Sequence, residues 1–128
     1  VNVGLIGVGN LGEAFLRYGA GRQKEVLKRE GLIIKAAFDQ DDQKIGRHIA
    51  GVEIFPVRQL PELITQLGLT IMILTVPAGV AQEVFDTCVA GGVKAFLNFA
   101  PVKLKIPAGV RVHHADFTLQ LESLAYYS

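Results

Sequence analysis

Cysteine is almost absent from this chain, which has only Cys88, and tryptophan is missing altogether. A single cysteine cannot build a disulfide framework, and no spacing typical of a metal site occurs, so we predict neither. No apolar run reaches the ~18 residues of a membrane-spanning helix, and no signal peptide is recognisable. These absences favour a protein of the reducing cytoplasm that has no membrane partner.

The chain also has almost no excess of charge of either sign, because its 13 lysine and arginine residues nearly balance its 12 aspartate and glutamate residues. A nucleic-acid-binding surface needs clustered cations, which the net charge of +1 does not favour. The one charged cluster, residues 22–30, mixes both signs and is typical of a solvated helix extension. Half of the 128 residues are hydrophobic, enough for one globular domain with a core.

The first twelve residues carry the most informative motif, in which an apolar run leads into Gly7-x-Gly9-x-x-Gly12 and a helical pattern. In a dinucleotide-binding turn the first glycine permits a tight turn, the second lets a pyrophosphate approach, and the third allows close helix packing. The helix start offers N–H groups and a positive dipole end to the phosphates. A glycine-rich turn that only solves a packing problem is the alternative. The cofactor-binding residues predicted here are Gly7, Val8, Gly9, Asn10, Leu11 and Gly12.

Strand and helix patterns alternate along nearly the whole chain. Apolar runs predict strands over residues 1–6, 32–38, 52–55, 69–76, 93–99 and 110–114. Helices are predicted to begin at Leu11, Pro61 and Pro77, and a last one covers 116–127. This order predicts an α/β, Rossmann-like fold, a doubly wound parallel sheet with right-handed crossovers and helices on both faces. We expect residues 1–115 to form that domain and residues 116–128 a terminal helix.

Asp39 follows the second predicted strand directly. An acid there accepts hydrogen bonds from the adenosine ribose hydroxyls in dinucleotide-binding folds, and its charge would repel a 2′-phosphate. The next residues, Gln40 to Asp42, provide no arginine to neutralise such a phosphate. The sequence therefore predicts NAD(H) rather than NADP(H) as the cofactor. The alternative role for Asp39 is to cap the turn over residues 41–46.

Two later strand ends belong to the predicted cofactor rim, because ligands of open α/β sheets bind beyond the carboxyl ends of the strands. Asn98 can hydrogen-bond a ribose or a carboxamide, or it can simply form a turn, and we favour the ligand role. The rim residues predicted at these two strand ends are Thr75, Val76 and Pro77, then Asn98, Phe99 and Ala100.

The chain lacks evident catalytic equipment. His113 and His114 are adjacent on a predicted strand and face opposite sides, so they cannot serve one site. His48 lies near a turn, and Cys88 lies on the apolar stripe of a helix, which is typical of a core residue. We therefore expect no catalytic residue and no enzymatic activity.

The terminal helix over residues 116–127 is apolar on more than one side. Phe117, Leu121 and Leu124 form one stripe, whereas Leu119 and Tyr126 lie off it. Such a helix must bury more than one side, which favours packing against another subunit, most simply in a two-fold dimer. A helix that covers only its own sheet is the alternative.

Several motifs in order resemble the bacterial redox-sensing transcriptional repressor family Rex, from Val3 to Tyr127. The matching segments are Gly7-Val8-Gly9-Asn10-Leu11-Gly12, Tyr18-Gly19, Ala36-Ala37-Phe38-Asp39, Lys44-Ile45-Gly46, Ile73-Leu74-Thr75-Val76-Pro77-Ala78, Leu97-Asn98-Phe99-Ala100-Pro101-Val102, Ala115-Asp116-Phe117-Thr118 and Leu121-Glu122-Ser123-Leu124-Ala125-Tyr126-Tyr127.

This resemblance implies a homodimer that binds NADH and NAD⁺ competitively. It further implies release of operator DNA on NADH binding, through an N-terminal winged-helix domain that this chain does not contain. The terminal helix would be exchanged between subunits, and Phe117 would reach the partner's nicotinamide pocket. Tyr18 and Asp116 would form a hydrogen bond between the subunits that depends on which ligand is bound. The implied dimer and switch residues are Tyr18, Asp116, Phe117, Leu121, Leu124 and Tyr126.

Two other classes of protein compete with this interpretation. One is an enzyme module, either the CoA-binding domain of a succinyl-CoA-synthetase-like ligase or a dehydrogenase fragment. Asp39 favours a dinucleotide over CoA, because CoA carries a 3′-phosphate near the ribose hydroxyls. The other is a purely structural dimerisation domain, which the intact glycine-rich turn disfavours.

Overall fold

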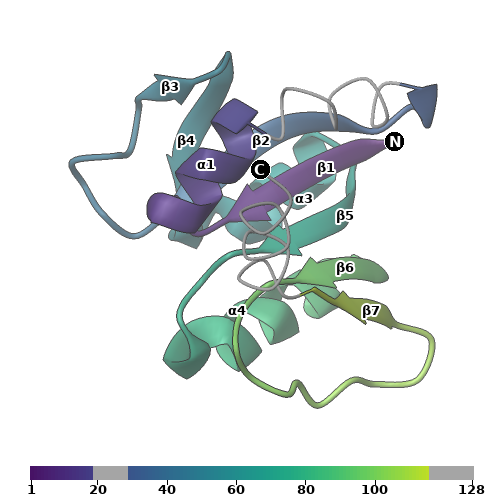
Figure 1. Ribbon diagram of the computed structural model, residues 1–128. Helices are drawn as coiled ribbons and strands as arrows, with labels where there is room; N and C mark the ends of the chain where they lie inside the picture. Colours follow the sequence, from purple (N-terminus) through teal and green to yellow (C-terminus); the bar gives the residue numbers. More distant parts are fainter. Residues whose placement is uncertain (19–28, 116–128) are drawn as a thin grey trace, which may run out of the picture.

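The computed structural model describes residues 1–18 and 29–115, which form a seven-stranded sheet with strand order β3-β4-β2-β1-β5-β6-β7 (Figure 1). All neighbouring strands are parallel except β3 and β4. The strands are β1 (Asn2–Ile6), β2 (Ile33–Asp39), β3 (His48–Ile49), β4 (Val52–Pro56), β5 (Leu69–Leu74), β6 (Ala95–Asn98) and β7 (Arg111–His114). The helices are α1 (Asn10–Tyr18), α3 (Leu60–Gln66) and α4 (Ala78–Ala90), with a 3₁₀ turn η1 (Val57–Gln59).

Helices cover both faces of the sheet, as the alternating pattern predicts (Figure 1). On one face, Phe15 and Leu16 of α1 pack in a core that includes Leu5. On the other face, apolar residues of α3 and α4 surround the strands, and the rings of Phe85 and Phe96 lie 4.5 Å apart. Apart from the exposed Thr70, β5 is apolar, and its side chains pack into the cores on both faces of the sheet.

The register of the three central strands positions the site. Ile6 at the end of β1 lies level with Phe38 of β2 and Leu74 of β5. The residues that follow these strands therefore meet at one edge of the sheet. Backbone bonds across this edge join Gly7 N to Phe38 O at 2.9 Å and Thr75 N to Ile6 O at 2.9 Å.

His48 lies between two turns, as expected, but the sequence did not predict the short strand that contains it. Residues 48–49 form the short strand β3, which pairs antiparallel with β4 and places His48 opposite Glu53. The two linking residues, Ala50 and Gly51, both have positive φ, at 51° and 83°, which is the geometry of a two-residue hairpin. Alanine rarely adopts positive φ, so the sequence contains no standard signal for this hairpin.

Cys88 lies in the α4 core with no solvent exposure, as the apolar stripe predicts. Burial raises the pKa of its thiol to about 12, which keeps the thiol protonated and unreactive. Within residues 1–18 and 29–115, no helix is long and apolar enough to cross a membrane. The same residues include no group of three or more metal-ligating side chains.

The predicted helix extension, up to residue 28, and the predicted helix 116–127 lie outside the described residues. The same is true of the switch residues Asp116, Phe117, Leu121, Leu124 and Tyr126. Tyr18 is the last residue of α1. The predicted dimer contacts therefore stay predictions.

Candidate functional site

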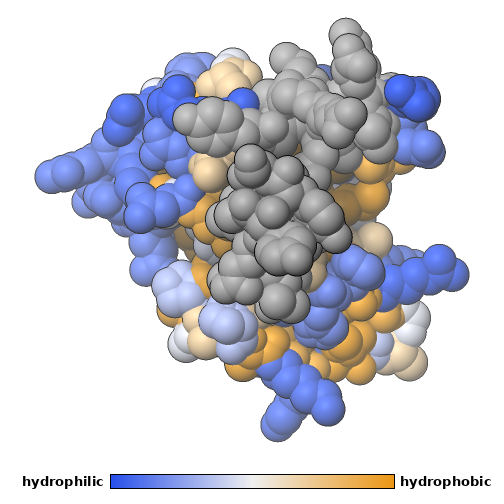
Figure 2. All heavy atoms as spheres, in the orientation of Figure 1, coloured by the Kyte–Doolittle hydropathy of each residue, from blue (hydrophilic) through white to orange (hydrophobic). Residues whose placement is uncertain are grey.

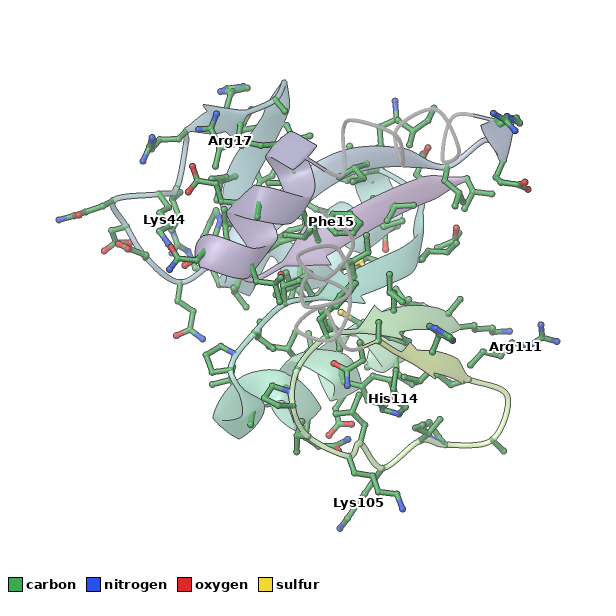
Figure 3. The ribbon with its side chains drawn as sticks, viewed as in Figure 1. Phe15, Arg17, Lys44, Lys105, Arg111 and His114 are labelled. Atoms are coloured by element: carbon green, nitrogen blue, oxygen red, sulfur yellow. The ribbon has the colours of Figure 1, made fainter. Side chains whose placement is uncertain are left out.

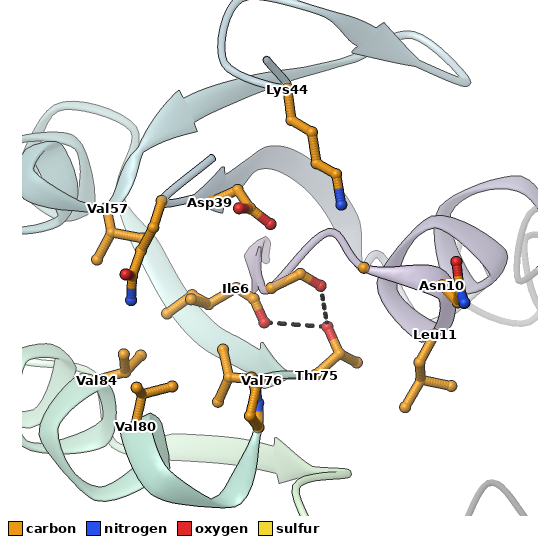
Figure 4. Close-up of a pocket in the computed structure, with 14 residues that line it drawn as sticks. Ile6, Asn10, Leu11, Asp39, Lys44, Val57, Thr75, Val76, Val80 and Val84 are labelled. Carbon is orange, nitrogen blue, oxygen red and sulfur yellow. Dashed lines mark hydrogen bonds between the residues drawn. The ribbon is translucent and has the colours of Figure 1, made fainter. Parts of the chain in front are cut away.

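A pocket of about 480 Å³ lies beyond the carboxyl ends of β1, β2 and β5 (Figure 4). This is where ligands bind in open α/β sheets, at the point where the strand order reverses. Part of its lining comes from the glycine-rich turn and the start of α1. The remaining lining is an acid–amide–cation group, Asp39, Gln40 and Lys44, and an apolar side of four valines, Val57, Val76, Val80 and Val84, together with Ile6, Thr75 and Pro77.

The three glycines of the turn have different surroundings. Gly7 has φ +99°, and a Cβ there would lie 2.6 Å from the carbonyl oxygen of Thr75. A Cβ on Gly12 would lie 1.9 Å from the carbonyl oxygen of Gly7. A Cβ on Gly9 would meet nothing within 4 Å. The tight turn at Gly7 and the close packing at Gly12 are therefore confirmed, and Gly9 leaves open space beside the pocket.

The first turn of α1 faces the pocket through Asn10 and Leu11. The helix is established at once, since Glu13 N donates to Gly9 O at 2.9 Å. The N–H groups at the start of any helix have no partner within that helix. Together with the positive end of the helix dipole, they make this part of the pocket suitable for an anionic group such as a pyrophosphate.

Asp39 ends β2 and is half-buried at the pocket. Its Oδ1 accepts from Asp41 N at 2.8 Å, so the alternative turn-capping role is confirmed. Its Oδ2 accepts from Val8 N at 2.7 Å, which links β2 to the glycine-rich turn. A carboxylate has about four acceptor sites, so two ribose hydroxyls can still be accommodated. The predicted ribose role and the observed capping role are therefore compatible.

Lys44 is a pocket residue that sequence reasoning missed. A turn over residues 41–44, in which Lys44 N donates to Asp41 O at 2.9 Å, directs its side chain back toward the glycine-rich turn (Figures 3 and 4). Its Nζ donates to Val8 O at 2.5 Å. Lys44 is the only cationic side chain among the described lining residues. The hydrophilic Asp41–Lys44 segment suggested only an exposed turn, and the space-filling view shows a hydrophilic surface in this region (Figure 2).

Thr75 connects β5 to the glycine-rich turn. Its hydroxyl lies 3.0 Å from Ile6 O and 2.6 Å from Gly7 O and donates to these carbonyls (Figure 4). Thr75, Val76 and Pro77 all line the pocket, as predicted from their place at a strand end. The hydroxyl of Thr75 thus fixes the backbone at the start of the glycine-rich turn by hydrogen bonding.

The end of β6 does not line this pocket. Asn98 is 1% exposed, and its Oδ1 accepts from Ala100 N at 3.0 Å. Its Nδ2 faces Ala100 O at 3.3 Å, Val102 O at 3.4 Å and His114 Nδ1 at 3.2 Å. These contacts give Asn98 the turn-forming role that was the alternative to ligand binding.

The aromatic ring of Phe99 lies 6.0 Å from that of Phe15, which faces the sheet from α1 (Figure 3). The pocket therefore includes most but not all of the predicted cofactor residues. Those that line it are Gly7, Gly9, Asn10, Leu11, Asp39, Thr75, Val76 and Pro77. Those that do not line it are Val8, Gly12, Asn98, Phe99 and Ala100. Three valines of the apolar side, Val57, Val80 and Val84, were missed, because they come from two other segments, η1 and α4.

A glycine-rich turn opening a helix, with an acid at the next strand end and an apolar slot opposite, defines a nucleotide-binding domain of the Rossmann-like class. Residues 1–102 match the CoA binding domain family, and the chain belongs to that family.

The expected resemblance to Rex is confirmed across nearly the whole chain. The chain is 43% identical over 126 residues to the redox-sensing transcriptional repressor Rex of Bacillus licheniformis, covering 98% of this chain and 56% of that protein. It is 42% identical over 127 residues to Rex of Leuconostoc citreum, covering 99% and 56%. The chain therefore spans little more than half the length of these relatives.

Solved structures give the same relationship. RSP, a Rex-family repressor, superposes with a TM-score of 0.83 at 31% identity, covering 98% of this chain and 57% of that one. RSP in complex with NADH superposes with a TM-score of 0.82, covering 98% and 58%. RSP in complex with NAD⁺ and operator DNA gives 0.82, covering 98% and 55%. A dehydrogenase from Vibrio fischeri, 18% identical with a TM-score of 0.56, shares the fold alone.

Proposed function

We propose that this chain is the NADH- and NAD⁺-sensing domain of a bacterial transcriptional repressor. The observation that carries the proposal is the pocket. It combines the glycine-rich turn and Asp39 on a chain 31% identical to RSP, whose structures include NADH and NAD⁺ complexes. In the whole protein, NADH binding would change the dimer arrangement and release operator DNA. DNA would be held by an N-terminal winged-helix domain outside this chain.

The pocket suits the adenosine and pyrophosphate parts of NAD(H). The adenine ring would lie against the apolar side formed by Val57, Val80 and Val84. The ribose hydroxyls would donate to Asp39, and the pyrophosphate would lie above Gly9 at the start of α1. The carboxylate of Asp39 would repel the 2′-phosphate of NADPH and the 3′-phosphate of CoA.

The distinction between the two redox states would arise at the nicotinamide ring. The dihydronicotinamide of NADH is uncharged and tolerates an apolar neighbour such as Phe117 of the partner subunit. The cationic ring of NAD⁺ is penalised more by the loss of water there. Such a difference in affinity is what shifts a two-state dimer, with Tyr18 and Asp116 bonding across the interface in one ligand state.

We propose a regulator of the cytoplasm rather than an enzyme. The observation that supports this is that the relatives are transcriptional repressors.

Calorimetric titration of the chain with NADH, NAD⁺, NADPH and CoA tests the proposal. We expect tight NADH binding, weaker NAD⁺ binding, and little binding of NADPH or CoA. Asp39→Ala should weaken NADH binding by about tenfold or more, since it loses charge-assisted bonds to the ribose. Strongest binding of CoA, or no binding of either dinucleotide, would contradict the sensor assignment.

Asp39→Ala also removes the acceptor of Val8 N–H, so a matched variant is needed. Asp39→Asn removes the charge and keeps one acceptor oxygen, which can serve Val8 N–H or Asp41 N–H but not both. It should retain more NADH affinity than Asp39→Ala and should narrow the preference for NADH over NADPH, because electrostatic repulsion of the 2′-phosphate is lost. An unchanged preference would show that Asp39 does not select the cofactor.

A further inference from the structure

Val8 lies at the centre of the glycine-rich turn and is held from several directions. Its side chain has no solvent exposure and packs in the α1 core with Phe15. Its N–H donates to Asp39 Oδ2 at 2.7 Å, and its carbonyl oxygen accepts from Lys44 Nζ at 2.5 Å. Two side chains of opposite charge thus bind the two polar groups of one backbone residue.

Asp39 is the last residue of β2 and Lys44 lies in the short connection that follows, which is itself ordered by hydrogen bonds. Asp39 Oδ1 accepts from Asp41 N at 2.8 Å, and Asp41 Oδ1 accepts from Gln43 N at 2.9 Å. Beyond the turn, Gly46 N donates to Ile54 O at 2.7 Å, which ties the connection to β4. The ammonium of Lys44 is therefore delivered to Val8 by a defined structure and not by a free side chain.

The charge of Lys44 is directed at a carbonyl rather than at a carboxylate. The ion pairs of the described residues are Glu13–Arg17 and His48–Glu53, so Lys44 forms none of them. Its half-buried position at the pocket reduces the competition of water for the ammonium. Hydrogen bonds with a charged partner are the strong ones, so this bond can restrain the turn.

The carbonyl of Val8 belongs to the peptide that leads into Gly9, whose own carbonyl accepts the first α1 hydrogen bond, from Glu13 N. From this geometry we infer that Lys44 is a positioning residue: it orients the Val8–Gly9 peptide and thereby the phosphate-binding start of α1. The consequence for cofactor affinity rests on the proposed function. Without the ammonium, a ligand would have to order the turn itself and would bind more weakly.

Three variants of the chain test this inference. Lys44→Met keeps the approximate length of the side chain but removes its charge and its hydrogen-bond donors. Lys44→Arg keeps the charge and the donors. Lys94→Met is the matched control, because Lys94 is an exposed lysine between α4 and β6, away from the pocket. Amide hydrogen exchange of the ligand-free chain, followed by NMR, reports on the turn directly.

The amides to follow are those of Val8 and Glu13, which donate to Asp39 Oδ2 and to Gly9 O. We expect both to exchange about tenfold faster in Lys44→Met, to recover in Lys44→Arg, and to be unchanged in Lys94→Met. The amide of Leu5 in β1 should exchange at the same rate in every variant, since it reports opening of the whole sheet. Unchanged exchange in the turn, or equal acceleration at Leu5, would overturn the positioning role.

NADH titration of the same variants supplies a second readout. Lys44→Met should weaken binding about tenfold, with rescue by Lys44→Arg. Weaker binding together with unchanged exchange in the turn would instead show that the ammonium acts on the ligand directly and would contradict the inference. If the unsubstituted chain binds no NADH, the proposed function fails, while the exchange result still decides the role of Lys44.

Discussion

At the scale of single residues, Gly9 and Gly12 have different roles in the same turn: Gly12 is needed for folding, whereas Gly9 is needed only for binding. A methyl group on Gly12 would lie 1.9 Å from Gly7 O, so Gly12→Ala must displace backbone. We expect a loss of about 2 kcal/mol in the free energy of unfolding, together with loss of NADH binding. Gly9→Ala meets no atom within 4 Å and should change that free energy by less than about 0.5 kcal/mol.

The methyl group of Gly9→Ala nevertheless occupies the space through which the pyrophosphate would approach. NADH binding should therefore fall although stability does not. Urea denaturation and NADH titration of the two variants, measured in parallel, check both expectations. Undiminished NADH affinity in Gly9→Ala would place the pyrophosphate elsewhere in the pocket.

At the scale of secondary-structure elements, the end of β6 depends on one buried amide. Asn98 joins Ala100 and Val102 of the following turn to His114 at the end of β7. Because Asn98 Oδ1 accepts from Ala100 N, its Nδ2 is the donor toward His114, whose Nδ1 must accept. The amide therefore connects two strands and a turn.

Asn98→Ala would leave several of these buried groups without partners. We expect it to lower the free energy of unfolding by about 3 kcal/mol in urea denaturation. His114→Ala removes only one partner, at an exposed residue, and should cost less than about 1 kcal/mol. If Asn98→Ala instead kept its stability and lost NADH affinity alone, the amide would act on the ligand, as first favoured from the sequence.

At the scale of the whole molecule, the central question is assembly. We expect sedimentation to give twice the 13.8 kDa mass of one chain, because the predicted helix 116–127 is apolar on more than one side and favours packing against a second subunit. Replacing Leu121 and Leu124 with glutamate should shift the chain to monomers. Replacing exposed Thr65 and Gln66 of α3 with glutamate adds the same charge and should leave the dimer intact. A monomeric unsubstituted chain would contradict the proposed dimer.

Much of the fold was accessible from the sequence because its determinants are local. The apolar run of β5 predicts a strand buried on both faces, and the spacing of Gly7, Gly9 and Gly12 predicts a turn into a helix. Pro77 and Gly91 bracket α4 in the sequence as in the structure. The position of the pocket was also predictable, because the carboxyl ends of parallel strands lie at one edge of the sheet.

The contacts that give the pocket its detailed form were decided only by the tertiary structure. Lys44 reaches Val8 across 36 positions of sequence, and the amide of Asn98 is used up by neighbours that no periodicity brings together. Periodicity and turn chemistry determine which elements form and which faces they bury, since these depend on neighbouring residues. Which side chain satisfies a given backbone group depends on distances through space, and those exist only once the sheet has assembled.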